Sequence, residues 1–189
     1  MTRELLDLQA LPALPWRNGA GLTRELALQP PDAGPDFDWR LSVAEVERDA
    51  PFSAFPGIDR CIVLLRGAGM RLVSADGSLD QRLERAHQAF HFSGDLALQG
   101  MLVAGPCRDF NVMTRRGRFR AEVQVLHGDA ETRPADAGLL LASLGHWSDG
   151  ARRLAPLQAW LWREALPALQ LRAQGEAPCA LLVRIEAVR

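Results

Sequence analysis

Residues 39–43 read WRLSV, an alternation of apolar and polar side chains with a period of two. This period is typical of a β-strand, because successive side chains of a strand point to opposite faces of its sheet. Residues 122–125, which read EVQV, repeat the pattern later in the chain. Both segments therefore predict strands that bury one face.

Several short, largely apolar runs accompany these segments, at residues 61–65, 97–103, 110–113, 139–141 and 179–183. Glycine, proline or charged residues bound the runs, so they fit buried strands better than helices. Helical patterns are weak. We expect one or two helical turns over residues 79–89, and a loop over residues 129–138, which lack periodicity. Many short strands separated by turns predict an all-β (mainly β) protein, either a sandwich or a barrel.

The length and composition suit a protein with a sizeable core. The chain has 189 residues, of which 48% are hydrophobic, enough for one large domain or two small, closely packed barrels. No apolar run approaches the roughly 18 residues of a transmembrane helix. Residues 1–16 carry Arg3, Glu4 and Asp7, which is unlike a secretory signal. We therefore expect a cytoplasmic protein that does not associate with a membrane.

The charge balance and the choice of basic residue exclude several classes of function. The net charge is -1, with both signs mixed along the chain, which argues against nonspecific nucleic-acid binding. All 22 basic residues are arginine, and the chain has no tyrosine. Enzymes that need a Schiff-base lysine or a tyrosine acid are therefore excluded.

Cysteine and histidine show no pattern of a metal site. Cys61, Cys107 and Cys179 are widely spaced and form no Cys-x-x-Cys pair. We expect them to be small buried hydrophobic residues rather than parts of a disulfide framework or a zinc site. His87 and His91 would share one face of a helix, but no third ligand accompanies them. The sequence predicts no bound metal and no cofactor, and it leaves open a cysteine–histidine pair assembled by the fold.

Three polar-rich segments are candidates for a binding site: residues 16–25 (WRNGAGLTRE), 51–60 (PFSAFPGIDR) and 109–116 (DFNVMTRR). In the first, Asn-Gly predicts a tight turn, and the glycines let a ligand or another backbone approach closely. The alternatives for the first two are a plain hairpin loop and a packed turn with a local ion pair. In the third, a strand would place Asp109 and Asn111 on one face, which suits a polar barrel lumen or a solvent-facing surface.

Arg115, Arg116, Arg118 and Arg120 form a basic cluster that two hypotheses can explain. One hypothesis is a nucleic-acid-binding regulator that uses this segment. The other places Arg116, Arg118 and Arg120 on one solvated face of a strand, and the balanced total charge favours it. We therefore expect no nucleic-acid partner.

The three polar-rich segments, together with residues 39–44 (WRLSVA), resemble the HutD/Ves family of small bacterial proteins. The motifs occur in the family's order within residues 10–126. Ala20 stands where the family usually has the middle one of three glycines. The resemblance implies a bicupin fold, that is, two packed cupin-like β-barrels with little helix. It implies one compact unit over residues 1–189, with approximate halves at residues 1–128, the first barrel and shared strands, and residues 129–189, the remainder of the second barrel.

The resemblance also implies a link to histidine utilisation in bacteria. Proteins similar to this family are thought to bind a formyl- or formimino-glutamate type of carboxylate and to act as regulators. Ordinary cupins hold a metal through His-x-His, Glu and a later His, a spacing that this sequence lacks. The first hypothesis is therefore a metal-free binder of a small carboxylate-bearing metabolite. A monomer and a homodimer both stay open.

The candidate ligand-binding residues come from the matching motifs. Arginine suits a carboxylate because its planar fork donates paired, charge-assisted hydrogen bonds. Asparagine and serine would bind neutral polar groups, and aromatic residues and methionine would form apolar walls. The full set is Asn18, Arg24, Glu25, Arg40, Ser42, Phe52, Phe55, Asp59, Arg60, Asp109, Asn111 and Met113, with Trp16 as a further apolar wall. The alternative hypothesis is a metal-independent isomerase or hydrolase of a small amino-acid derivative, with Glu25, Asp59 and Asp109 as acid–base groups.

Overall fold

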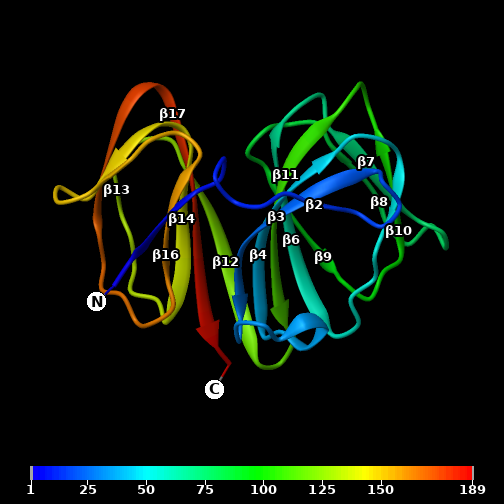
Figure 1. Cartoon of the computed structure of the whole chain (residues 1–189), viewed down its shortest axis with the longest axis horizontal. Coiled ribbons are helices and arrows are strands. Elements are labelled where there is room, and N and C mark those ends of the chain that lie inside the picture. Colours follow the sequence, from blue (N-terminus) through cyan, green and yellow to red (C-terminus); the bar gives the residue numbers. More distant parts are fainter. Residues whose placement is uncertain (1, 189) are drawn as a thin grey trace. The chain divides into compact units, whose positions relative to one another are not determined.

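The computed structural model describes residues 2–188, and its regular secondary structure consists almost entirely of antiparallel strands (Figure 1). Among these residues there is no α-helix, and η1 (Gly34–Asp36) is a single 3-10 turn. The chain forms two compact units. One is Pro12–Arg118, and the other joins the residues up to Leu11 with those from Phe119 onward. The prediction of an all-β fold is confirmed.

The unit Pro12–Arg118 contains two sheets. The six-stranded sheet has the order β2 (Leu14–Pro15), β3 (Gly21–Gln29), β4 (Trp39–Val46), β11 (Cys107–Arg115), β6 (Ile58–Arg66) and β9 (Ala89–Ser93). The four-stranded sheet has the order β5 (Ala50–Phe52), β10 (Leu98–Leu102), β7 (Met70–Ser74) and β8 (Asp80–Leu83). Residues from both sheets form one apolar cluster, so the two sheets enclose a shared interior.

The interior of this unit follows from the alternation along its strands. In β6, Ile62 and Leu64 are completely or almost completely buried in the apolar cluster. Arg60 lies two positions before Ile62 and therefore points to the same side of the sheet. Asn111 on β11 lies directly opposite Ile62, so it shares that side as well. The apolar filling of the interior thus gives way to polar side chains at one end of the same strand faces.

The other unit has its own sheet, in the order β1 (Glu4–Asp7), β16 (Gln158–Trp162), β14 (Ala137–Ser148), β17 (Gln170–Ala187) and β12 (Phe119–Leu126). Two short strands extend it, since β13 (Ala130–Glu131) pairs with β17 and β15 (Arg153–Leu154) pairs with β14. Trp147, Trp160 and Trp162 lie in its buried apolar cluster. Large side chains therefore fill the interior of this unit.

The chain passes from one unit to the other between Leu11 and Pro12 and again between Arg118 and Phe119. Strand β12 pairs along its whole length with β17 and so belongs with the C-terminal strands. The first strand, β1, pairs with β16 and belongs with them too. The close joining of the two barrels stays a prediction.

The predicted strands at residues 39–43 and 122–125 are confirmed as parts of β4 and β12. The helical turns expected over residues 79–89 are wrong. Asp80–Leu83 is strand β8, which pairs with β7 so that Leu83 lies opposite Met70, and both side chains are buried. The loop expected over residues 129–138 is interrupted by β13 and the start of β14. Among the described residues, no helix has the length and apolar character that crossing a lipid bilayer requires.

Candidate functional site

A cavity of about 800 Å³ lies at the polar end of the interior in the unit Pro12–Arg118. Three arginines line it, Arg17, Arg40 and Arg60, and no acidic side chain of the described residues does. Nine of the residues expected from the sequence line the cavity: Trp16, Asn18, Arg40, Ser42, Phe52, Phe55, Arg60, Asn111 and Met113. Cations without lining acids make this cavity suitable for an anion.

Strand register explains why residues far apart in the sequence meet in this cavity. Met113 on β11 lies directly opposite Arg40 on β4 and directly opposite Arg60 on β6. Asn111, two residues earlier, lies opposite Ser42. Residues directly opposite each other in an antiparallel pair point to the same face of the sheet. The alternation in WRLSV and DFNVM therefore places polar side chains from three neighbouring strands on one surface.

Arg60 is the most enclosed cation of the cavity, with only 5% of its surface exposed. Its Nη2 donates to Asn111 Oδ1 at 2.8 Å, and its Nη1 donates to the Ser53 carbonyl at 3.4 Å. Its Nε is buried and has no partner in the described part of the chain. Burial lowers the pKa of Arg60 from 12.5 to about 10, so the side chain keeps its charge at neutral pH.

Aromatic rings surround the same guanidinium. The Arg60 Cζ atom lies 4.9 Å from the ring centre of Phe92, 5.5 Å from that of Phe55 and 5.9 Å from that of Phe52. Such contacts with ring faces stabilise a desolvated cation. They also exclude water from its surroundings, which strengthens electrostatic attraction to an anion at this place.

Asp109 lies beyond Asn111 and does not line the cavity, although it was a candidate. Its surface is 1% exposed. Its Oδ1 accepts a hydrogen bond from Asn111 Nδ2, and its Oδ2 has no hydrogen-bond partner among the described residues. Burial raises the pKa of Asp109 to about 7, and the nearby charge of Arg60 opposes this rise.

Glu25 lies at the margin of the site. Its Oε2 accepts a hydrogen bond from Arg40 Nε at 2.9 Å, and 38% of its side chain is exposed. It does not line the cavity itself, but it neutralises part of the charge on a residue that does. An anionic ligand at Arg40 would therefore compete with Glu25.

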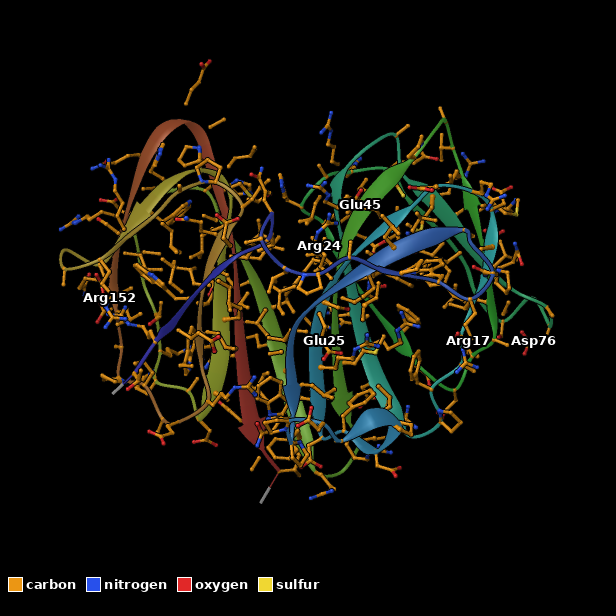
Figure 2. All side chains as sticks on the ribbon, viewed as in Figure 1. Arg17, Arg24, Glu25, Glu45, Asp76 and Arg152 are labelled. Atoms are coloured by element: carbon orange, nitrogen blue, oxygen red, sulfur yellow. The ribbon has the colours of Figure 1, made fainter. Side chains whose placement is uncertain are left out.

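The structure does not bring Arg24 and Asp59 into the cavity. Arg24 pairs with Glu45 at 2.5 Å (both are labelled in Figure 2). Arg24 lies between Thr23, which lines the cavity, and Glu25, so it points to the opposite face of β3. Asp59 is exposed and pairs with Arg116 at 2.8 Å, and it precedes Arg60 on the opposite face of β6.

The first polar-rich segment forms a hairpin loop between β2 and β3 that contributes to the cavity wall. Trp16 Nε1 donates to Thr23 Oγ1 at 2.7 Å, and the Trp16 ring meets the Phe52 ring edge-on. Asn18 Oδ1 accepts from the Ala20 amide at 3.0 Å. These contacts hold the loop in place beside β3 and keep Trp16 in the wall as expected.

The alanine at position 20 fits this loop. Gly19 has a φ of +64°, a conformation that favours glycine, whereas Ala20 has no positive φ. At Gly21 an added Cβ would lie 2.3 Å from the carbonyl oxygen of Glu45. Glycine is thus required at the first and third positions of the triplet and not at the second, so the substitution is tolerated.

Comparison with known proteins agrees with these features. The model of the HutD family matches residues 8–181. The chain belongs to the HutD family. Protein Ves of Cronobacter sakazakii is 37% identical over 175 residues, which cover 92% of this chain and 94% of that protein. An uncharacterized 21.2 kDa protein in the hutC 3' region of Pseudomonas putida is 38% identical over 144 residues, which cover 76% of this chain and 75% of that protein.

Solved structures extend the comparison to the fold of the HutD family. A conserved protein of unknown function from Pseudomonas aeruginosa PAO1 has a TM-score of 0.87 and 35% identity, covering 98% of this chain and 100% of that one. HutD from Pseudomonas fluorescens SBW25, solved in a formate condition, has a TM-score of 0.86 and 25% identity over all of both chains. The oxalate decarboxylase of Lactobacillus farciminis, with a TM-score of 0.64 and 7% identity over 98% of this chain and 86% of that one, shares the fold alone. The predicted bicupin class is confirmed.

Sequence reasoning missed several residues that line the cavity of this HutD-family chain. One of them is Arg17, which follows Trp16 in the first motif. Another is Thr23, whose hydroxyl accepts the hydrogen bond from the Trp16 indole. Ser53 follows Phe52 at the end of β5, and its carbonyl accepts from Arg60. The alternation of β3 could have indicated Thr23, because Thr23 and Glu25 share one face. No pattern indicated Arg17 or Ser53, since both lie outside regular strands.

The remaining expectations about cysteine and histidine can be compared with the structure. All three cysteines are buried, as expected, and burial raises the pKa of the Cys61 thiol to about 12. Among residues 2–188, no three His, Cys, Asp or Glu side chains come together as ligands for a metal ion. His91 lies on β9 and is exposed.

The basic cluster does not form one face of a strand as expected, because Arg116 and Arg118 lie in the turn between β11 and β12. Each exposed arginine of this cluster has an acidic partner among the described residues. Arg116 pairs with Asp59 and Asp95, Arg118 with Asp38, and Arg120 with Glu186. Arginines neutralised in this way leave little charge for a phosphate backbone.

Proposed function

We propose that this chain binds a small carboxylate-bearing metabolite in the cavity of the unit Pro12–Arg118, without a metal. The observation that carries the proposal is the state of Arg60. It is buried and charged, and it forms no direct ion pair with a described residue, because Asn111 separates it from Asp109. It also lines a cavity that no acidic side chain of the described residues lines. An unpaired buried charge is costly, so the site gains free energy when an anion binds there.

The donors of Arg60 suit a carboxylate. A guanidinium has five N–H donors in a planar fork, and two of those of Arg60 donate to Asn111 and Ser53. The remaining donors retain capacity for ligand oxygens. Ser42 and Asn111 add neutral polar groups to the same wall, while Phe52, Phe55 and Met113 provide apolar contact for the carbon atoms of the ligand.

A second cation extends the proposal to a ligand with two anionic or polar ends. Arg40 and Arg60 lie on the two strands that flank β11, on either side of Met113. Neighbouring strands are about 4.8 Å apart, so roughly 10 Å separates these two backbones. Long arginine side chains can converge from this separation on the two ends of a glutamate-sized molecule. This spacing supports a formyl- or formimino-glutamate type of ligand.

We further propose a cytoplasmic regulator of histidine utilisation that senses this type of carboxylate. The relative from Pseudomonas fluorescens was solved in a formate condition. Formate is the smallest carboxylate and carries the group that an arginine fork recognises. This supports, for the present chain, a site whose minimal ligand element is one carboxylate.

The experiment is a thermal-shift screen of the metal-free protein, followed by calorimetry of each ligand that gives a shift. The screen contains N-formyl-L-glutamate, formimino-L-glutamate, glutamate, glutarate and formate, with divalent metal ions as a separate arm. We expect the Tm to rise with the concentration of a glutamate derivative, because a ligand of the native state stabilises it. No shift with any small acid would overturn the proposal, and a shift with metals alone would overturn its metal-free part.

The second candidate function, a metal-independent isomerase or hydrolase, rests on one observation. Glu25 is a carboxylate at the margin of the cavity, within hydrogen-bond distance of Arg40. The other two acid–base candidates, Asp59 and Asp109, do not line the cavity. Turnover of a formimino compound that is lost in Glu25→Gln would favour the enzyme. An unchanged ligand after long incubation favours the binder.

A further inference from the structure

A buried hydrogen-bonded network leads from the cavity to Asp109, an acid that does not line the cavity. Arg60 Nη2 donates to Asn111 Oδ1 at 2.8 Å, and Asn111 Nδ2 donates to Asp109 Oδ1. The amide of Asn111 therefore separates the two charges, which form no direct ion pair. Asp109 Oδ2 accepts no hydrogen bond from any described residue, although it is buried.

The surroundings of Asp109 provide little other charge. Across the sheet it lies opposite Ala44 on β4 and Leu64 on β6, which are both apolar. On its own strand Cys107 and Asn111 share its face. Arg60 is the cation that acts on Asp109, and the Cys107 thiol, whose pKa burial raises to about 12, stays neutral. The negative charge of Asp109 thus depends on Arg60 for compensation.

The other charged groups near Arg60 lie outside this hydrogen-bonded network. Arg40 on β4 adds a second positive charge near Arg60, and Glu25 on β3 neutralises part of it. Strand β9 contributes the Phe92 ring, while His91 is exposed and alternates with it. An anion that binds Arg60 consequently enters a region where Asp109 already supplies one negative charge.

We propose that binding of an anion at Arg60 draws a proton from solvent onto Asp109, so that this buried carboxyl makes the ligand affinity rise as the pH falls. The inference rests on the proposed function of the cavity. Two negative charges that share one buried cation repel each other strongly where water is excluded. Protonation of one of the two anions removes this repulsion. Asp109 takes up the proton because its carboxyl is buried, so water does not stabilise its negative charge.

The geometry allows the proton to bind without disturbing the site. Oδ2 is the carboxyl oxygen without a partner, so a proton placed there leaves the bond from Asn111 Nδ2 to Oδ1 intact. Asn111 then keeps its orientation, with Oδ1 towards Arg60. Burial raises the pKa of Asp109 to about 7, which agrees with a proton exchanged near neutral pH. Asp109 is therefore a positioning residue whose charge state controls the affinity of Arg60.

The test is calorimetry of the full chain with N-formyl-L-glutamate and, separately, with formate. The ligand carboxylates have pKa values near 4 and stay ionised between pH 6 and 8.5, so the ligand itself takes up no proton in this range. At pH 7.5 the binding enthalpy is measured in HEPES and in Tris, whose ionisation enthalpies differ. We expect the difference to indicate the uptake of a fraction of a proton to one proton per ligand. We also expect the affinity to fall by up to tenfold per pH unit as the pH rises.

Two variants assign the proton. Asp109→Asn keeps the shape of the side chain and removes its titration, so we expect binding to persist with little pH dependence and no proton uptake. Asp59→Asn is the matched control, because Asp59 is exposed and lies on the opposite face of β6 from Arg60. It is expected to keep the pH dependence of the wild type.

The outcomes separate the two proposals. Binding by the wild-type protein with equal enthalpies in both buffers and a flat pH profile would overturn this inference and leave the proposed function standing. The same applies if Asp109→Asn binds with an unchanged pH profile. If that variant does not fold, the wild-type proton count decides. Absence of binding by both probes at every pH would overturn the proposed function and this inference together.

Discussion

Arg60 and Asn111 are joined by a 2.8 Å hydrogen bond between side chains of the neighbouring strands β6 and β11. The bond fixes one edge of the guanidinium and directs the Asn111 carbonyl oxygen to it. It also requires the Asn111 amide nitrogen to face Asp109, which accepts from it. The position of the cation in the cavity is therefore set by a polar network within the sheet and not by solvent.

Replacing Arg60 by glutamine removes the charge while keeping a polar side chain. We expect the affinity for N-formyl-L-glutamate to fall by roughly 10- to 100-fold, since a hydrogen bond to a charged group contributes about 1.5–3 kcal/mol. Isothermal calorimetry measures this loss. Arg24→Gln is the matched control, because Arg24 is paired with Glu45 on the opposite face of the sheet. Equal loss in both variants would contradict the assignment of Arg60.

Glu25→Gln is expected to strengthen binding of an anion. Glu25 accepts from Arg40 Nε at 2.9 Å and so competes with a ligand for this cation. A glutamine can still accept that hydrogen bond but carries no charge, so the positive potential of the cavity increases. We expect the affinity for a dicarboxylate such as glutarate to rise several-fold, measured by calorimetry at low salt. Weaker binding would show that Glu25 itself contacts the ligand.

Part of the fold could be predicted from the sequence because two of the strands that carry the motifs alternate polar and apolar residues. WRLSV lies in β4, and DFNV lies in β11. The error at residues 79–89 has a physical cause. Strand β8 is a short strand with exposed residues at its edge, and its pairing with β7 is a long-range property that a local pattern does not reveal.

The site could be predicted in part for the same reason. Arg40 and Ser42, or Asn111 and Met113, are two residues apart and must share a face once a strand is assumed. Arg24 and Glu25 are adjacent, so they could not both face the cavity. Which of them does so depends on the register of β3 with β4 and on the irregularity between Glu25 and Ala27. Register is a property of the sheet, and a single sequence does not contain it.

Gly21→Ala tests the close approach of the first loop to β4. A Cβ at this position would lie 2.3 Å from the Glu45 carbonyl oxygen, so one of the two backbones has to move. We expect a loss of about 1–3 kcal/mol in the free energy of unfolding, as for other overpacked sites, and weaker ligand binding because the loop carries Trp16 and Arg17. Urea denaturation measures the stability.

The control for Gly21→Ala is the neighbouring Ala20→Gly. Ala20 has no positive φ but is buried, so glycine there adds freedom to the unfolded chain, at a cost of at most about 1 kcal/mol, and removes one buried methyl group, at about 0.8 kcal/mol. If the two variants lose the same stability, the close contact with Glu45 does not constrain the loop.

The buried carboxyl of Asp109 also predicts how stability depends on pH without any ligand. Its pKa is raised from 3.8 to about 7 by burial, so between these values the folded protein binds more protons at this group than the unfolded chain. The contribution of Asp109 to stability therefore falls as the pH rises through this range, and it stays low above pH 7. The Asp109→Asn variant has no carboxyl at this position, so its stability does not fall with pH for this reason. The free energy of unfolding of Asp109→Asn relative to wild type should consequently increase between pH 4.5 and 7.5, by at most about 1.4 kcal/mol per pH unit.

Urea denaturation of the two proteins at pH 4.5, 5.5, 6.5 and 7.5 measures this difference. All other ionisable groups are the same in both proteins, so their contributions cancel in the comparison. A difference that stays constant between pH 4.5 and 7.5 would mean that the pKa of Asp109 in the folded protein is not raised above its value in the unfolded chain. Arg60 would then hold the carboxyl ionised despite its burial, and an anion at Arg60 would bring no proton onto it near neutral pH.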